Sequence, residues 1–187
     1  MELTPSSTWK HGTRPTMQSQ TIRMHLDSTV LKNLERGCLA HMMVIELLSV
    51  LAECRCEWHE CTIEPGDSLV TIVLVPDSKH ASRIALYIDD ETIGISAGRG
   101  AYMNVPDDVE VPERYSTAQY SAKIVNAILG GYLHETVYSK LSRAYKWDFE
   151  LMVENRRIAL ERTDLPRALL TFWARSQREE IVYKSVC

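Results

Sequence analysis

The spacing of apolar residues changes along this chain, and the change limits the folds it can adopt. Between Val30 and Ala52 they recur every three or four positions, as on one face of an α-helix. After Cys54 they alternate with polar residues, as along a half-buried strand, and the alternation is strongest from Tyr145 to Val153. Strands grouped between helices favour antiparallel sheets and argue against a Rossmann-type parallel sheet.

The predicted fold is α+β: an antiparallel sheet of about seven strands in two meanders, with three helices packed against it, in the order α-ββββ-α-βββ-α. Ser116, with Gln119 three positions later, has the spacing of a capping box for the second helix. The third helix begins near Asp164, and Leu169, Leu170 and Trp173 are expected to face the core. Residues 181–186 fit either a continuation of that helix or a final strand. The predicted strands are 54–58, 69–75, 84–88, 93–95, 132–139, 145–153 and 157–162.

Length and composition predict one domain with a polar arm. Residues 1–26 hold five Thr, three Ser and a single acid, too little apolar surface to fold alone, so 27–187 is the predicted single α+β domain. A transit peptide is the alternative for the arm. The formal net charge of −4 argues against a nucleic-acid partner, and no apolar run approaches the roughly 20 residues of a membrane span. We therefore expect a cytoplasmic protein with reduced thiols and no membrane partner.

Four potential metal ligands lie close together in the sequence. They are Cys54, Cys56, His59 and Cys61. Alternation along a strand would send the first two to one face and the last two to the other, so one ion could not readily contact all four. Small half-buried cysteines are the preferred interpretation, and a zinc site is the less favoured alternative. We expect no metal and no other cofactor.

The chain carries none of the familiar catalytic sequence motifs, which favours a non-enzymatic role without excluding an enzyme. The segment Gly98-Arg99-Gly100 follows a strand, but neither a helix nor a lysine comes next, as a phosphate-binding loop requires. It is predicted to be a turn in which glycine supplies a positive φ. Arg99 would then be exposed and able to bind a carboxylate of a partner.

The leading functional hypothesis is a protein-binding module that uses an acidic face. The predicted contact residues are Asp89, Asp90, Glu91, Arg99, Asp107, Asp108 and Glu110. Such a face would attract a partner with a basic surface. In its mild acidity and lack of catalytic motifs the chain resembles stand-alone immunity and antitoxin proteins of bacteria, which block a toxin. That resemblance is one of general type and rests on no motif.

The alternative hypothesis is a small-molecule-binding or catalytic fold with an aromatic pocket between sheet and helices. The residues proposed to line it are Trp58, His59, His134, Tyr145, Trp147 and Phe149. Aromatic side chains on a sheet face can line a ligand groove, but strict alternation is also what core packing produces. The sequence also leaves a homodimer open.

Overall fold

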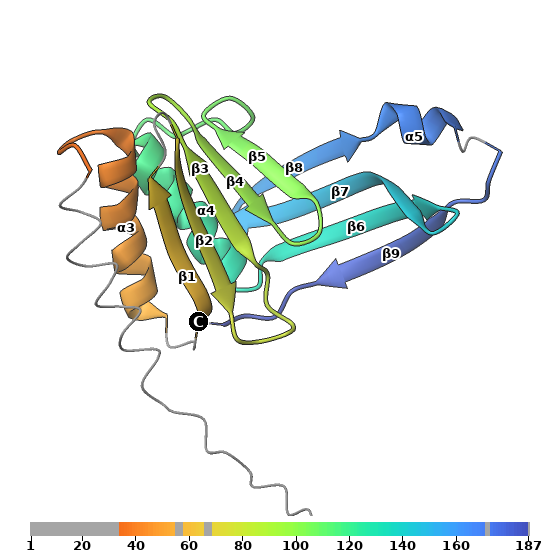
Figure 1. Cartoon of the computed structure of the whole chain (residues 1–187), viewed down its shortest axis with the longest axis horizontal. Helices are drawn as coiled ribbons and strands as arrows, with labels where there is room; N and C mark the ends of the chain where they lie inside the picture. The colour runs from red at the N-terminus through yellow and green to blue at the C-terminus, as the bar shows by residue number, and fades with distance from the viewer. Residues whose placement is uncertain (1–33, 55–57, 66–68, 171–172, 187) are drawn as a thin grey trace, which may run out of the picture.

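A computed structural model of the chain describes residues 34–54, 58–65, 69–170 and 173–186. Within them, nine strands form two antiparallel sheets accompanied by three helices (Figure 1). Sheet A has the strand order β1-β2-β3-β4-β5, and sheet B has the order β8-β7-β6-β9. The elements are α3 (Leu39–Glu53), β1 (Trp58–Pro65), β2 (Val70–Pro76), β3 (Ile84–Ile88), β4 (Ile93–Ala97), β5 (Ala101–Val105), α4 (Thr117–Leu129), β6 (Leu133–Lys140), β7 (Arg143–Val153), β8 (Arg156–Thr163), α5 (Leu165–Leu170) and β9 (Gln177–Val182). The predicted α+β class is confirmed.

The strands differ from the prediction in number and grouping. The sequence predicts a loop after Gly98, whereas β5 follows the turn and pairs with β4. Near the C-terminal end, where the sequence allowed either a helix or a strand, the structure has strand β9, which pairs with β6. The first strand begins at Trp58 rather than Cys54, because Cys54 is the C-cap of α3. The five-residue β5 has too few alternations to stand out from a loop in the sequence.

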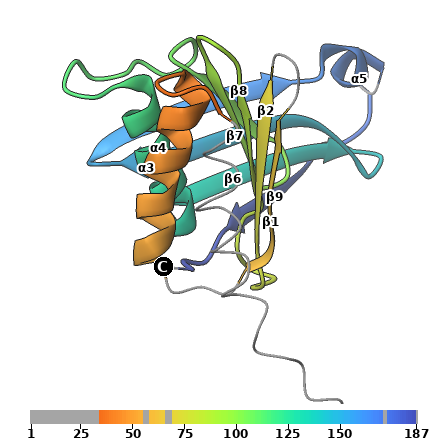
Figure 2. The same cartoon turned by 60° about the vertical axis from the view of Figure 1, so that its left-hand side comes forward.

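The core surrounds helix α4. This helix packs against α3, against β4 of sheet A and against β7 of sheet B, and β5 also approaches β7 (Figure 2). Buried side chains from both helices and both sheets join in one continuous cluster. The fully buried side chains of sheet A include Ile72, Leu74, Ile84, Leu86, Ile88, Ile93, Ile95 and Met103. Each sheet therefore has an inner face on the core and an outer face turned away from it.

The start of α4 follows the sequence prediction. The Ser116 side chain accepts a hydrogen bond from the Gln119 backbone N–H at 3.2 Å, and the Gln119 side chain accepts one from the Ser116 N–H at 3.1 Å. This capping box satisfies two of the donors that a helix start leaves unpaired. At the other end Gly130 is the C-cap, and Gly131 has a φ of +78°.

The first helix is shorter at its start than the apolar stripe suggests. Gly37 has a φ of +89°, which a continuing helix does not permit, and Cys38 is the N-cap of α3. The predicted caps Asp27 and Ser28, like the whole predicted arm 1–26, lie outside the described residues.

Cys54 corrects the expectation of reduced thiols. Its side chain is fully buried, and it forms a disulfide. Cys56 and the side chains of His59 and Cys61 are also outside the description, so the proposed cluster of four is not seen as a whole. Among the side chains that are described, no group of three or more His, Cys, Asp or Glu could hold a metal ion.

The third helix does not pack as predicted. Helix α5 has six residues, and the side chains of Leu169 and Trp173 are 70% and 69% exposed, so the expectation that they face the core is wrong. The side chain of Leu170 is outside the description. The reason is topological: β8 and β9 lie at opposite edges of sheet B, so their connection crosses beyond the end of the sheet, away from α4 (Figure 1). Within the described part of the chain, no helix is long and apolar enough to cross a membrane.

The turn 98–100 joins the two sheets. Gly98 has the predicted positive φ, +60°. The backbone N–H of Arg99 donates to the buried Glu135 carboxylate of β6 at 3.0 Å, and the Tyr183 hydroxyl donates to the same oxygen at 2.8 Å. Burial and the neighbouring Glu135 carboxylate raise the pKa of the Tyr183 hydroxyl, which keeps this donor protonated. Gly100 lies against Trp147, where an added Cβ would come within 2.5 Å of the indole.

Replacement of Gly98 by alanine tests this junction, and Gly37→Ala is a matched control. Both glycines have positive φ, but a Cβ at position 37 meets no atom within 4 Å, whereas at position 98 it meets Tyr183 and lies 2.8 Å from Glu135 Oε2. We expect Gly37→Ala to lower the free energy of unfolding by about 1 kcal/mol from backbone strain alone, and Gly98→Ala by about 3 kcal/mol because overpacking adds to that strain. Urea denaturation measures both, and equal losses would contradict the junction.

Candidate functional site

The predicted acidic residues lie together at one end of sheet A. Asp89, Asp90 and Glu91 form the β3–β4 turn, and the loop after β5 carries the others. Because Ile93 pairs with Val105, the start of β4 lies beside the end of β5 and brings the two segments to the same end. All six carboxylates are exposed. We call this set the acidic edge: Asp89, Asp90, Glu91, Asp107, Asp108 and Glu110.

Three members of the acidic edge make contacts within the chain. Asp89 accepts hydrogen bonds from the backbone N–H groups of Glu91 and Thr92, at 2.9 and 2.6 Å, and from the Thr92 hydroxyl at 2.9 Å. Asp108 accepts from the Asn104 N–H at 2.7 Å, and Glu110 lies 3.4 Å from Arg156. No ion pair among the described residues involves the other three, so their charges remain available to a partner.

Arg99 lies away from the acidic edge, in the β4–β5 turn at the opposite end of the same strands. Its guanidinium forms an exposed ion pair with Glu179 of β9 at 2.9 Å. The sequence prediction groups Arg99 with the acids, but the topology separates them. The carboxylate that Arg99 contacts belongs to its own chain.

The residues of the alternative hypothesis do not meet in one pocket. Trp58 and Phe149 are buried in the core. Trp147 is half-buried on the inner face of sheet B, and Tyr145 is half-buried at an irregularity in the β6–β7 register. His134 is exposed on the outer face and lines a polar hollow there. The side chain of His59 is outside the description. The aromatic alternation from Tyr145 to Phe149 mainly contributes to the inner face.

A second hollow lies between α3 and α4, and three of its lining residues, Arg114, Tyr115 and Lys123, contact Glu154 beside it. Glu154, in the β7–β8 turn, accepts from Lys123 at 2.6 Å, from Arg114 at 3.0 Å and from the Tyr115 hydroxyl at 2.8 Å. The hydrogen bonds from Lys123 and Tyr115 lower the pKa of Glu154, which keeps it ionised. This network connects α4 to sheet B, and that structural role is enough to explain why these charged residues lie together.

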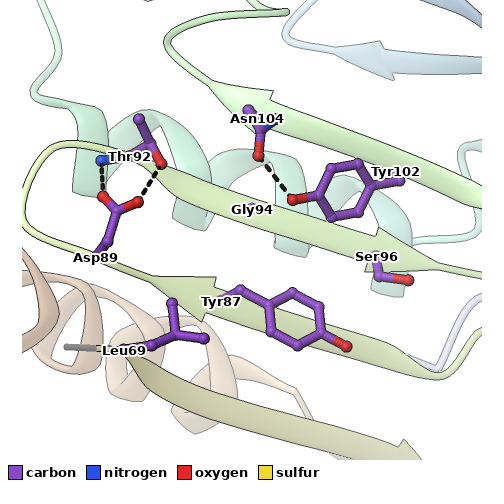
Figure 3. A pocket seen from close by; sticks show the side chains of 8 residues that line it. All are labelled: Leu69, Tyr87, Asp89, Thr92, Gly94, Ser96, Tyr102 and Asn104. Carbon is purple, nitrogen blue, oxygen red and sulfur yellow. Dashed lines mark hydrogen bonds between the residues drawn. The ribbon is translucent and has the colours of Figure 1, made fainter. Parts of the chain in front are cut away.

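The outer face of sheet A carries a groove that the sequence analysis does not identify. Tyr87 of β3 and Tyr102 of β5 stand on either side of Gly94 in β4, as Figure 3 shows. The hollow has a volume of about 460 Å³. We call it the tyrosine groove, and its lining residues are Leu69, Tyr87, Asp89, Thr92, Gly94, Ser96, Tyr102 and Asn104.

Glycine at position 94 makes the groove possible. A Cβ there would come within 2.7 Å of the Tyr102 hydroxyl and 3.3 Å of Asn104 Oδ1. The Tyr102 hydroxyl donates to Asn104 Oδ1 at 2.8 Å, which holds its ring across the glycine. The two tyrosine side chains are each 37% exposed, so they present ring area to solvent while their positions are supported by the sheet.

The outer face of sheet A is uncharged across four strands. Pairing places Thr71, Val73 and Val75 of β2, Ala85 and Tyr87 of β3, Gly94 and Ser96 of β4, and Tyr102 and Asn104 of β5 on this face. Sheet B is different, because its outer face carries Lys146, Asp148, Glu150, Arg157, Glu161, Arg178 and Glu180. A solvent-facing sheet surface ordinarily carries charged side chains, so the uncharged outer face of β2–β5 is the exception, with Glu64 of β1 at its margin. The signal in the sequence is the absence of charge at alternate positions, which is visible only once the strand register is known.

The Asp89→Ala variant tests the turn next to the groove. Hydrogen bonds from the Thr92 and then the Glu91 backbone lower the pKa of Asp89 below 3.8, so its ionised form stabilises the folded state above that pH. We expect Asp89→Ala to lower the free energy of unfolding by about 1 kcal/mol at neutral pH. The difference from wild type should shrink as the pH falls through the lowered pKa, where Asp89 becomes protonated in both states. Urea denaturation at several pH values measures it, and a pH-independent difference would contradict this role.

The tyrosine groove and the acidic edge are continuous, because Asp89 belongs to both. Together they form one surface at the outer face and one end of sheet A. Comparison of the chain with models of known protein families, with curated proteins and with solved structures finds no match.

Proposed function

We propose that this protein is a non-enzymatic binding module that holds a basic surface of another protein against the outer face of sheet A. The observation that carries the proposal is the uncharged sheet face with the tyrosine groove, which meets the acidic edge at Asp89. The groove would take an aromatic or branched apolar side chain of the partner. The acidic edge would contact lysines or arginines beside it.

The groove has the physical properties of a contact site. Tyrosine is enriched at protein interfaces because it offers a large rigid apolar area together with a hydroxyl. Tyr87 and Tyr102 are held by the sheet, so little side-chain entropy is lost when a partner binds. Because the outer-face residues of β2–β5 carry no charge, Asp89 is the one ion among the residues that line the groove, and it lies toward the acidic edge.

The acidic edge supplies orientation and speed of association. Exposed carboxylates of one sign attract a cationic surface over a Debye length of about 8–10 Å at physiological ionic strength. Asp90, Glu91 and Asp107 are the members with free charges. In its most specific form, the proposal is that the protein is a cytoplasmic inhibitor of the immunity or antitoxin type. Its partner would then be a basic toxin.

Tyr87→Ala and Tyr102→Ala test the groove. A displayed library of random peptides is selected against the immobilised full chain, and the enriched peptides are titrated by fluorescence anisotropy. We expect enriched peptides to carry net positive charge and an aromatic or branched residue. Each tyrosine variant should weaken their binding about tenfold, as loss of an interface anchor does. Tyr132→Ala, at a tyrosine that is 59% exposed elsewhere, is the control and should bind normally. Unchanged binding by both groove variants would refute the proposed site.

Reversal of charge at the acidic edge tests the second half of the surface. Asp90→Lys with Asp107→Lys changes two carboxylates that have no structural role in the described fold. We expect slower association of the same peptides at low salt, with the difference lost at high salt because screening removes the attraction. Glu35→Lys with Glu53→Lys makes the same change of net charge at exposed positions near α3 and should leave the association rate nearly unchanged. If both double variants slow association equally, net charge and not the acidic edge is responsible.

A further inference from the structure

The end of sheet B that lies furthest from α4 exposes large apolar side chains. It consists of the β6–β7 turn, residues 140–143, and the described parts of the β8–β9 connection, residues 164–170 and 173–176, at the same end of the sheet (Figure 1). We call it the sheet B tip. Leu141, Leu165, Leu169 and Trp173 are 59%, 65%, 70% and 69% exposed there. Exposed apolar side chains that gather in one place mark interaction surfaces, whereas scattered ones do not.

The turn at the tip exposes its leucine in an unfavourable backbone conformation. Leu141 and Ser142 have φ of +51° and +61°, the conformation of a two-residue hairpin turn that Asn-Gly adopts most easily. A leucine with positive φ costs about 1–2 kcal/mol. The corresponding turn between β7 and β8 has the same conformation but uses the polar pair Glu154 and Asn155. Folding therefore does not account for the leucine at the tip.

The tip is also the basic part of an acidic protein. Residues 140–143, 164–170 and 173–176 contain four basic side chains and one acid, a formal charge of +3 in a chain of net charge −4. Arg143 and Arg175 are exposed, and no ion pair among the described residues involves either of them. Lys140 lies over the Tyr145 ring, 4.9 Å from its centre, with its charge near the turn. The surface therefore combines projecting apolar side chains with free cations.

The extent and charge of the tip indicate which occupant fits these side chains. The four apolar side chains are exposed, and none of them lines the hollows described above. A stable protein interface needs about 800 Å² on each side with close shape complementarity, whereas the exposed apolar side chains here are four, on a two-residue turn, a six-residue helix and the loop after it. A lipid surface deforms around projecting side chains, buries leucine and tryptophan at the acyl boundary and attracts lysine and arginine when its headgroups are anionic.

We propose that the sheet B tip docks peripherally on an anionic lipid surface, with Leu141, Leu165, Leu169 and Trp173 inserted and the surrounding arginines at the headgroups. From the sequence, no membrane partner is expected because no apolar run is long enough to span a bilayer, but a peripheral contact needs no span. Docking at this end leaves the outer face of sheet A free, so the proposal is independent of the peptide-binding function.

The test measures cosedimentation of the full chain with vesicles of phosphatidylcholine alone or mixed with phosphatidylserine. We expect binding to the phosphatidylserine vesicles that weakens with salt, and little binding to phosphatidylcholine alone. Arg143→Glu with Arg175→Glu should weaken binding about tenfold or more, because each basic residue near an anionic surface contributes about 1 kcal/mol. Lys79→Glu with Arg83→Glu is the matched control, since both residues are exposed and far along the chain from the tip.

A turn variant separates docking from stability. Leu141→Asn with Ser142→Gly should raise the melting temperature, because Asn-Gly fits the turn, and should weaken vesicle binding about tenfold through loss of the inserted leucine. Val182→Asn removes an apolar side chain that is 64% exposed away from the tip and should bind normally. In vesicles with brominated acyl chains, the quenching of tryptophan fluorescence should be largely lost in Trp173→Phe, which still binds.

Several outcomes would overturn the proposal. They are equal binding to both kinds of vesicle, unchanged binding by the tip variants, and equal losses in the matched controls. Quenching that persists in Trp173→Phe would place another part of the chain in the lipid. A dimer in sedimentation equilibrium that the tip variants abolish would identify a second copy as the occupant. Binding of soluble polyglutamate with the same dependence on the tip would identify an acidic protein.

Discussion

Burial of helix α4 is the constraint on which the rest of the fold depends. Nine of its thirteen residues are buried, so it cannot lie on a surface with only one face covered. Helix α3, strand β4 of sheet A and strand β7 of sheet B each cover part of it. Because two sheets are needed to cover α4, their inner faces have to come together around it. The glycines at 98 and 100 allow this, since without a Cβ the β4–β5 turn can approach Glu135 and Trp147 of sheet B closely.

This arrangement leaves the two outer sheet faces and the sheet B tip unused by the core. Sheet B pairs charges on its outer face, as a surface in water ordinarily does. Sheet A instead presents tyrosines around Gly94, and the tip presents leucines and a tryptophan among arginines. Folding requires neither departure. The two proposals assign them different contacts: a basic protein surface for the groove beside the carboxylates, and an anionic lipid surface for the cationic tip.

Local sequence signals predicted the elements whose hydrogen bonds and side-chain patterns involve only neighbouring residues. The Ser116–Gln119 capping box and the alternation after Tyr145 involve neighbouring residues, and both are found where the sequence indicates. The failures have distant causes. Strand β5 exists because β4 offers it a pairing edge, and α5 is exposed because its strands lie at opposite edges of sheet B. The apolar stripe through Leu169 and Trp173 has helical spacing but no core to face, since spacing does not specify a partner.

By itself, the sequence determined the α+β class, the antiparallel meanders, the start of α4 and the concentration of acids in two turns, because these depend on residue types within a few positions of one another. Only the tertiary structure decided how those parts combine. Strand register brought the two acidic turns to one end, sent Arg99 to the other and placed Tyr87 and Tyr102 across Gly94. Register depends on which side chains the sheets must bury against α4, a requirement that acts over the whole chain and leaves no local pattern.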